Sequence, residues 1–447
     1  MKTAKRLLAI LLSVLLIVAM TACSSKETTP PAAQTDSTGD ITQTAPATEA
    51  SGDAVELTFW AGLTGADLNA MQGMVDAFNA SQSAIKVNFY SISWSEIFSK
   101  FEASFNTDNG PDVMLMHVTD VPNFGGRDML SDVSEISAAA GVKGEDYPAS
   151  VWNGAFYNGT QYAIPWDYHN MCVYVNNSLF EAAGLDPAAE ITSEEQFLAI
   201  CDALKASGVY PMSMSASHAH TYRYWYGLLY QFGGSFCDDA FTTASFNSEA
   251  GVKAMEFLAK IVDNEYCPTN ETDIDADWLS GQTAMVIEGP WFTPTAVQAG
   301  FEFTTVAFPT IGDSAAVWGS SHTLTVPRFD NRSAEKTEAI NTFLSYFVEH
   351  SYEWGATSGQ IPANNAVSAS DAYKACDFYP YQVSFIESST GVHYEPLCVA
   401  DSEFGADNAL SPVMAAITNC LSDTSVDFMA ELDAAAASVN DIFSEYQ

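Results

Sequence analysis

Residues 55–89 read VELTFWAGLTGADLNAMQGMVDAFNASQSAIKVNF, and the spacing of apolar residues changes twice within them. Val55, Leu57 and Phe59 alternate with polar residues, as in a strand with one buried face. Apolar residues between Leu68 and Phe78 follow helical spacing, and residues 85–89 alternate again. The stretch therefore predicts a strand, a helix and a second strand.

The alternation of strand and helix continues beyond this stretch. Ser93 and Glu96 have the spacing of a capping box before a predicted helix over 97–105, and residues 113–116 read as a buried strand. Such an order predicts a parallel sheet covered by helices, which is the α/β class. Further helices are predicted at 192–208, capped by Thr192 and Glu195, and at 334–348.

A later strand carries unusual residues at its carboxyl end. The apolar run 284–287 is followed by Glu288, then by Gly289-Pro290 and by Trp291. Gly289-Pro290 ends the strand, and neither a carboxylate nor a tryptophan at that end adds to the packing of the core. In open α/β sheets ligands bind beyond the carboxyl ends of strands. These residues are therefore candidates for a binding site.

The N-terminus has the pattern of an export signal. Lys2, Lys5 and Arg6 precede an apolar run over 7–20, which is short for a membrane span of about 20 residues. Residues 1–22 are predicted to be a signal peptide, and Met20-Thr21-Ala22-Cys23 resembles a bacterial lipobox with Cys23 as the lipidated residue. Residues 23–53 are rich in Ser, Thr, Pro and Ala and predict a flexible tether. An ordinary secretory signal is the alternative.

Composition restricts the partners. The chain has 56 acidic and 16 basic residues, a net charge of −40. Nucleic-acid binding needs a basic patch, so no nucleic-acid partner is expected. The acidity also keeps a secreted protein soluble.

Cysteine and histidine patterns predict no metal and no cofactor. Seven cysteines remain after Cys23, so at least one is unpaired in a monomer, and none forms a CxxC motif. His218-Ala-His220 lacks a nearby Cys or acidic residue to complete a zinc set. Asp273-x-Asp275-x-Asp277 suggests a calcium loop, but Trp278 stands where glycine is needed.

Five segments in order resemble one known family. They are LTFWAG (57–62), GPDVML (110–115), NGTQYAIPWDYHNMCVYVNNSLFEAAGLDP (158–187), GQTAMVIEGPWF (281–292) and SGQIPANNAV (358–367). Together they resemble the extracellular solute-binding proteins of bacterial ABC importers, in the carbohydrate-binding branch (family 1), from about residue 55 to the end.

The resemblance implies a two-lobe, periplasmic-binding-protein-like (type II) fold with a ligand cleft between the lobes and a hinge that the chain crosses three times. By resemblance the crossings lie near 168–172, 320–324 and 363–368. Lobe 1 would comprise residues 54–168 plus 324–363, and lobe 2 residues 172–320 plus 368–447. Such lobes close around a ligand by a hinge motion.

A sugar offers flat C–H patches and a rim of hydroxyls, which match aromatic faces and polar side chains respectively. Several candidates for contacts are implied by the resemblance, by their place after strands, or by both. They are Trp60, Trp94, His117, Asp120, Trp166, Asp167, His169, Tyr222, Trp225, Glu288, Trp291 and Trp318.

Alternatives remain open for some of these residues. Trp60 and Trp94 fit the core equally well, Trp291 could pack between helices, and Glu288 could cap a helix. Trp152, Trp278 and Trp354 are assigned to the structure alone.

The function implied is a non-enzymatic, extracytoplasmic receptor that captures a sugar or oligosaccharide and delivers it to an ABC transporter permease. It is expected to be a monomer held at the cell membrane through its N-terminal lipid only. The alternatives are a secreted glycoside hydrolase, which needs two suitably spaced carboxylates, and a surface adhesive lipoprotein. No HExxH, GxSxG, Walker A or GxGxxG motif occurs in the sequence.

Overall fold

A computed structural model describes residues 54–105, 109–268 and 273–446. The predicted signal peptide, the tether and Cys23 lie outside the described residues. Within them, no helix has the length and apolar character to cross a membrane.

The first sheet contains the predicted alternation. Its order is β2-β1-β3-β13-β6, and β1 is parallel to both β2 and β3. β13 is antiparallel to β3 and β6, so the sheet is mixed, because two of its strands come from distant parts of the chain. The elements are β1 (Val55–Ala61), α2 (Gly65–Ser81), β2 (Ile85–Ser91), α3 (Trp94–Phe105), β3 (Val113–His117), β6 (Ala163–Pro165), β13 (His322–Thr325) and α13 (Ala334–Glu349).

The second sheet has the order β11-β8-β10-β9. β10 is parallel to β9 and antiparallel to β8, which is also antiparallel to β11. This sheet and the helices around it comprise β8 (Cys172–Asn176), α7 (Asn177–Ala182), α8 (Glu194–Ala206), β9 (Tyr210–Ser213), α9 (Ala219–Gln231), α10 (Glu249–Asp263), α11 (Ile274–Leu279), β10 (Thr283–Glu288), β11 (Phe303–Ala307), α19 (Pro412–Ser422) and α20 (Phe428–Glu445).

The start of α8 differs by one residue from the prediction. Ser193, not Thr192, is the N-cap, and its hydroxyl accepts a hydrogen bond from the backbone N–H of Gln196. The Gln196 side chain accepts in return from the backbone N–H of Thr192. The reciprocal pattern is that of a capping box, shifted by one position.

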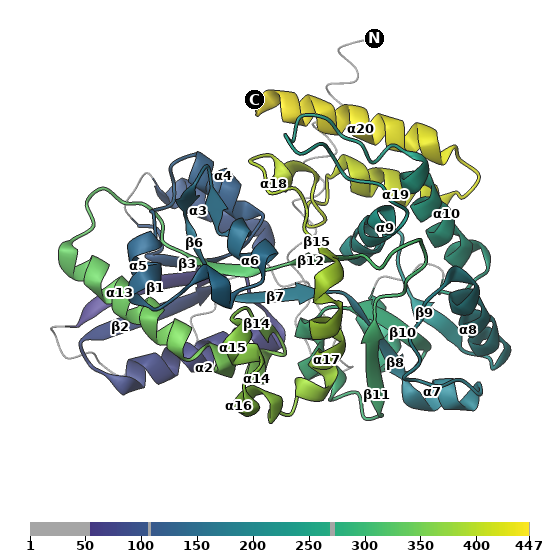
Figure 1. Ribbon diagram of the computed structural model, residues 1–447, viewed down its shortest axis with the longest axis horizontal. Coiled ribbons are helices and arrows are strands. Elements are labelled where there is room, and N and C mark those ends of the chain that lie inside the picture. Colours follow the sequence, from purple (N-terminus) through teal and green to yellow (C-terminus); the bar gives the residue numbers. More distant parts are fainter. Residues whose placement is uncertain (1–53, 106–108, 269–272, 447) are drawn as a thin grey trace, which may run out of the picture. The chain divides into compact units, whose positions relative to one another are not determined.

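Four short strands form a third sheet between these two. Its order is β14-β7-β12-β15, with bounds β7 (Asp167–Asn170), β12 (Val317–Ser320), β14 (Ile361–Pro362) and β15 (Val392–His393). β7 leads from β6 of the first sheet to β8 of the second, and β12 leads from β11 back to β13. Figure 1 shows β7 and β12 running between the two groups of elements.

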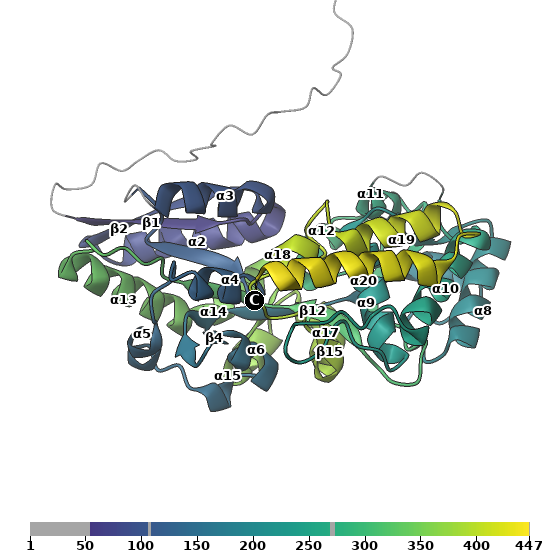
Figure 2. The ribbon, with the colours of Figure 1, turned by 90° about the horizontal axis from the view of Figure 1, so that it is seen from above.

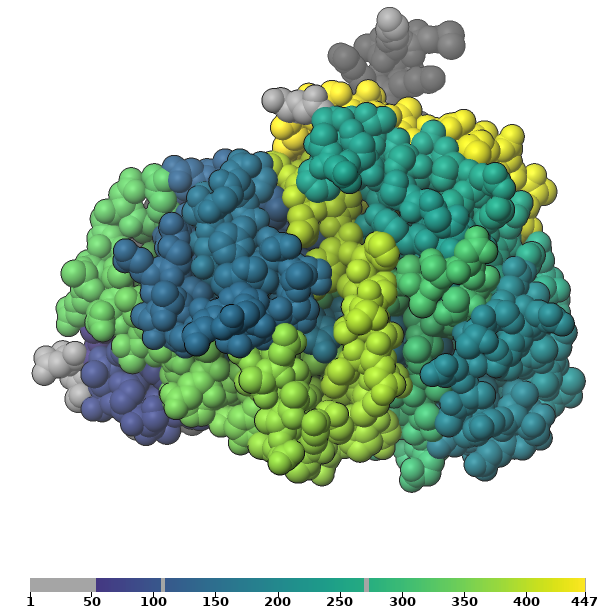
Figure 3. Space-filling model, in the orientation of Figure 1, coloured from purple at the N-terminus to yellow at the C-terminus, as the bar shows by residue number. Residues whose placement is uncertain are grey.

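The remaining elements surround these sheets. They are α4 (Asp120–Gly126), α5 (Ser134–Ala139), α6 (Ala149–Gly154), β4 (Phe156–Tyr157), β5 (Thr160–Gln161), α12 (Thr293–Ala296), α14 (Ser351–Ser358), α15 (Asn365–Ser368), α16 (Asp371–Lys374), α17 (Tyr379–Ser388) and α18 (Asp401–Phe404), with short 3₁₀ turns at Gly144–Asp146, Pro290–Phe292 and Ser389–Gly391. Figure 2 shows α19 and α20 side by side. On the face drawn in Figure 3, the yellow-green part of the chain, which includes α17, lies between the blue and the teal parts.

Apolar side chains fill the space on both sides of the third sheet. One large buried cluster surrounds the second sheet, and another surrounds the first and extends across to Tyr174 and Trp278. All seven cysteines after Cys23 are free, so the prediction of at least one free thiol is confirmed.

Candidate functional site

The residues at the tip of β10 point into a cluster of rings. Glu288 is buried, accepts a hydrogen bond from the backbone N–H of Gly289 and contacts Nε2 of His220. Trp291, half-buried, stands edge-to-face against His169 at 5.3 Å between centroids and against His220 at 6.1 Å. The acid and the tryptophan therefore meet imidazoles from two other elements, β7 and α9.

Two tryptophans of this cluster lie directly on glycines. A Cβ at Gly289 would come within 2.2 Å of the Trp291 ring, and one at Gly62 within 2.0 Å of the Trp94 ring. Such separations are impossible for real atoms, so only glycine lets either indole lie against the backbone here. The glycines of the GPW and FWAG stretches thus position their aromatic rings.

The first sheet contributes Trp94, His117 and Asp120. The Trp94 ring lies 4.3 Å from His117 and stacks on His322 at 5.9 Å with an interplanar angle of 11°. Asp120 accepts a hydrogen bond from the backbone N–H of His117, and its carboxylate lies 3.8 Å from His117 Nδ1. Strand β3 therefore ends in polar groups that lie beside an indole.

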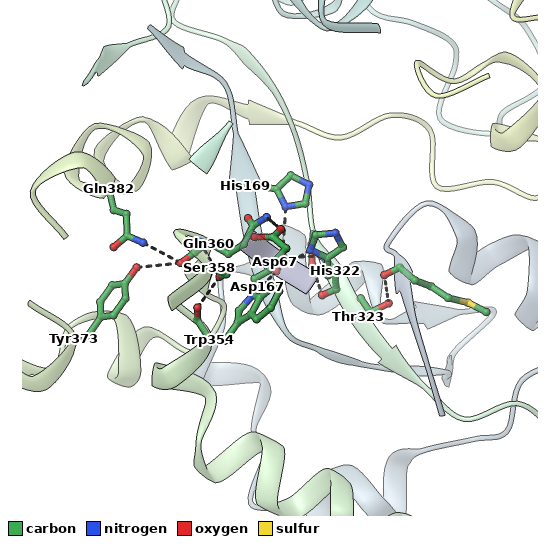
Figure 4. Close-up of polar contacts among 12 residues, drawn as sticks. Asp67, Asp167, His169, His322, Thr323, Trp354, Ser358, Gln360, Tyr373 and Gln382 are labelled. Carbon is green, nitrogen blue, oxygen red and sulfur yellow. Dashed lines mark hydrogen bonds and ion pairs between the residues drawn. The ribbon is translucent and has the colours of Figure 1, made fainter. Parts of the chain in front are cut away.

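Strand β7, between the two sheets, contributes the buried carboxylate of Asp167 and the imidazole of His169, and β13 of the first sheet contributes His322 (Figure 4). Asp167 accepts hydrogen bonds from the backbone N–H of His322 at 2.9 Å and from the Trp354 indole at 2.8 Å, and it lies 2.8 Å from His322 Nδ1. His169 Nδ1 lies 3.5 Å from the same carboxylate. Trp354, assigned to the structure alone from the sequence, thus orients a group of the site.

The elements around the second sheet contribute Arg223, which lies over the ring of Trp318. The Arg223 guanidinium lies 4.4 Å from the ring centroid of Trp318, within the range of a cation–π contact. It also donates to Asp407 at 2.7 Å and lies 2.9 Å from His220 Nδ1. The Trp318 indole donates to Glu395 at 2.7 Å. Trp318 is also 6.1 Å from His169, which connects this group to the rest of the cluster.

Burial changes the ionisation of these groups. It raises the pKa of Glu288 and Glu395 to about 7 and that of Asp120 to about 8. It lowers the pKa of His117 to about 3 and that of His169 to about 4. Most of the imidazoles are therefore neutral at pH 7, when an imidazole can both donate and accept a hydrogen bond.

The buried ion pair is the exception. Burial disfavours its charged forms, but the attraction of Asp167 raises the pKa of His322, and His322 with His169 lowers the pKa of Asp167. Both pKa shifts therefore favour the charged form of the partner concerned.

The structure brings eight of the twelve predicted residues into one connected cluster. They are Trp94, His117, Asp120, Asp167, His169, Glu288, Trp291 and Trp318.

The structure places the other four predicted residues outside this cluster. Trp166 lies in the core against Phe347, because it alternates with Asp167 along the chain and faces the other way. Trp225 is fully buried against Phe246, and its indole donates to the Gly251 carbonyl. Tyr222 is buried in the core, where its ring stacks on Tyr226. Trp60 is half-buried and packs against the apolar cluster beside α3.

Sequence reasoning missed the residues that complete the cluster. These are His220, Arg223, His322, Glu395 and Asp407. His220 and Arg223 lie on α9, the helix that also carries the predicted contacts Tyr222 and Trp225. His322 lies in the predicted second crossing. Glu395 and Asp407 follow no motif, and we find no feature of the sequence that indicates them.

The structure also changes the view of metal ligands. His218 Nδ1 accepts from the His220 backbone N–H, and both His220 ring nitrogens face other side chains, so this pair is no metal site. By contrast, one potential ligand atom from each of Asp167, His169 and His322 lies within 4.8 Å of the others. No spacing in the sequence indicated this group, since His322 is far along the chain.

Comparison with known proteins identifies the family. A family model described as bacterial extracellular solute-binding protein matches residues 73–377, more than half of the chain. The chain belongs to this family. The predicted recognition as an extracellular solute-binding protein is therefore confirmed, and this family is one of binding proteins and not of enzymes.

Relatives of this solute-binding protein are distant. The diacetylchitobiose binding protein DasA of Streptomyces coelicolor is 23% identical over 308 residues, covering 65% of this chain and 69% of the relative. The sn-glycerol-3-phosphate-binding periplasmic protein UgpB of Brucella melitensis is 22% identical over 352 residues, covering 72% and 78%.

Solved structures confirm the fold. The cyclic alpha-maltosyl-1,6-maltose binding protein from Arthrobacter globiformis superposes with a TM-score of 0.73 at 23% identity, covering 88% of this chain and all of that chain. The solute-binding protein therefore has the predicted two-lobe α/β fold.

Proposed function

We propose that this solute-binding protein captures a neutral sugar or oligosaccharide between its lobes and delivers it to an ABC permease without chemical change. The observation that carries the proposal is the convergence of Trp94, Trp291 and Trp318 on one set of imidazoles and carboxylates. Indoles match the C–H faces of a pyranose, and the polar groups match its hydroxyls. Several relatives bind sugars by name, which supports the same ligand class.

The charge of the site favours a neutral ligand over a phosphate such as the one named for UgpB. Carboxylates around the cluster outnumber the single arginine, Arg223, whose guanidinium is already bonded to Asp407. An anion here would meet carboxyl groups with pKa values of about 7 to 8 and an arginine that is already paired, so its charge would be poorly compensated in a buried setting. A hydroxyl can instead donate to these carboxylates.

Closure of the lobes is part of the proposal. We assign lobe 1 to residues 54–168 plus 324–363, lobe 2 to 172–320 plus 368–447, and the hinge to the segments around β7, β12 and β14. Residues of both lobes meet the first crossing at His169, whose ring lies 5.3 Å from Trp291 of lobe 2 and 6.4 Å from His117 of lobe 1. A ligand that contacts both lobes binds the closed state better and so shifts the population toward it.

Location and partners follow from the family and from the N-terminal pattern. We propose export, cleavage before Cys23 and lipidation of that thiol, with residues 23–53 as the tether. The receptor would then act as a monomer beside a permease in the cell membrane. Mass spectrometry of the mature N-terminus checks this, since a diacylglyceryl cysteine has a distinct mass.

Calorimetry with a panel of mono- and oligosaccharides tests the function. One-to-one binding with no change in the sugars, checked by product analysis, is expected. Steady release of shorter sugars would favour the hydrolase.

The variant Trp291→Ala should weaken binding by more than about 1 kcal/mol, the scale of an aromatic contact. Its matched control is Trp152→Ala, because Trp152 is another half-buried tryptophan and packs on Phe156 outside the cluster. Equal affinity of the two variants would remove Trp291 from the site.

A further inference from the structure

We propose that Asp167, His169 and His322 bind one zinc ion between β7 and β13. The set is two imidazoles and one carboxylate, and imidazole with carboxylate oxygen suits Zn²⁺ among divalent ions. All three side chains are buried, with exposed fractions of at most 5%. The proposal rests on this group alone and not on the identity of the transported solute.

The distances suit one ion. Zn–N and Zn–O bonds measure about 2.0–2.2 Å, so two donors on one tetrahedral ion lie roughly 3.4 Å apart. The carboxylate of Asp167 lies 2.8 Å from His322 Nδ1 and 3.5 Å from His169 Nδ1. These two distances run to different oxygens of Asp167, and the three ligand atoms lie within 4.8 Å of one another, so binding one ion would draw them closer together.

An unpartnered atom points to the same place. His169 Nδ1 is buried and has no hydrogen-bond partner, although it faces the Asp167 carboxylate. Buried polar atoms are nearly always paired, and each exception calls for an explanation. The contact of His169 with the carboxylate is longer than that of His322, and a divalent ion between the three groups would bind the carboxylate and both imidazoles.

The surroundings hold the three groups in place. The Trp354 indole and the backbone N–H of His322 both donate to Asp167, as outer-shell partners do for metal-binding carboxylates (Figure 4). Asp167 and His169 are two residues apart on one strand and therefore project to the same side. A zinc ion here would link β7, which follows the first sheet along the chain, to β13, with which the chain re-enters that sheet.

The fourth position of the ion would face aromatic rings. Trp94 stacks on His322, while Trp291 and Trp318 flank His169. A site with three protein ligands keeps one position for water or for an oxygen of a ligand. A solute hydroxyl is the ligand oxygen that this setting offers.

Titration of EDTA-stripped protein with zinc chloride, followed by calorimetry, tests the proposal. One zinc per chain is expected, and His169→Ala and His322→Ala should each lower the affinity at least tenfold. Trp354→Phe removes only the N–H to Asp167 and should weaken zinc about ten- to hundredfold, as outer-shell changes do. His350→Ala and His393→Ala are controls, because these histidines stack on Tyr346 and Tyr230 outside the group.

Cobalt(II) gives a second readout, since its visible absorption reports imidazole ligation and should change in His169→Ala. No zinc binding by the wild type, or full affinity in His169→Ala, overturns the proposal. If His322→Ala does not fold, His169→Ala decides, because His169 Nδ1 makes no hydrogen bond on which the fold depends. Sugar calorimetry in EDTA is independent, so loss of zinc binding and loss of sugar binding are distinguished.

Discussion

Gly62 and Gly289 are the residues on which two of the site's indoles rest. The missing Cβ allows Trp94 and Trp291 to contact the backbone, and any larger residue would displace the ring. We expect Gly289→Ala and Gly62→Ala each to weaken solute binding by about tenfold or more, or ~1.4 kcal/mol. Calorimetry with the solute found in the panel measures this.

Gly73→Ala on α2 is the matched control. A Cβ at Gly73 meets no atom within 4 Å, so the change should leave affinity unaltered and stabilise the helix by roughly 0.5–1 kcal/mol. Unchanged affinity in Gly289→Ala would show that the position of Trp291 is unimportant.

Asp67 is a buried carboxyl whose ionisation should govern stability. It accepts a hydrogen bond from Gln360 at 2.9 Å, and burial raises its pKa to about 7 against an ordinary value of about 3.9. Between these values the unfolded chain binds fewer protons than the folded one, so stability falls as pH rises. The slope from this group is at most about 1.4 kcal/mol per pH unit.

The variant Asp67→Asn keeps an acceptor for Gln360 and removes the charge. Denaturant unfolding from pH 4 to 8 should therefore show a smaller loss of stability than in the wild type. Asp76→Asn, on the exposed side of the same helix, should keep the wild-type slope. Identical slopes in all three proteins would contradict the assignment to Asp67.

The residues around β7 show how far individual residues of the candidate site could be predicted from the sequence. Asp167 and His169 were predicted and lie in the site, whereas their neighbour Trp166 faces the core. Side chains alternate along extended chain, so Trp166 and Asp167 face opposite ways. No strand was predicted at residues 166–169, so this alternation was not available from the sequence. His322 could not be paired with Asp167 in advance, since 155 residues separate them.

At the scale of elements, α9 is the least predictable. Eleven of its thirteen residues are buried, so its apolar pattern has no exposed side to set the orientation. His220 and Arg223, three apart, face the site, while Tyr222 and Trp225, also three apart, face the core. The resemblance indicated Tyr222 and Trp225 as contacts, whereas His220 and Arg223, on the other face of the helix, are the residues that join the cluster.

The two faces of α9 should respond differently to mutation. Trp225→Ala removes a buried indole and should lower the free energy of unfolding by about 3–5 kcal/mol, with little change in solute affinity below its melting temperature. Arg223→Met keeps an unbranched side chain but loses the cation–π contact with Trp318 and the bonds to Asp407 and His220. It should weaken solute binding about tenfold with a small change in stability.

Thermal unfolding and calorimetry on both variants separate these effects. Loss of affinity in a folded Trp225→Ala protein would return Trp225 to the site.

At the scale of the whole molecule, the alternation of strand and helix predicted the α/β class, and five motifs in order predicted the family. What could not be predicted is the set of long-range contacts that closes the site. Asp67 meets Gln360, and Arg223 meets Asp407, pairs separated by 293 and 184 residues. Each pair lies within one lobe but joins segments that the hinge crossings separate along the chain, and no local sequence pattern records such a pairing.

Closure of the lobes over a solute should make the molecule more compact in solution. If Trp291, His169 and Arg223 close over a solute, a saturating sugar should shift the population from open to closed and reduce the radius of gyration in X-ray scattering. Trp291→Ala at the same sugar concentration should show a smaller reduction, and Trp152→Ala the full one. A wild-type radius that does not change at full occupancy would mean that the solute binds to one lobe only.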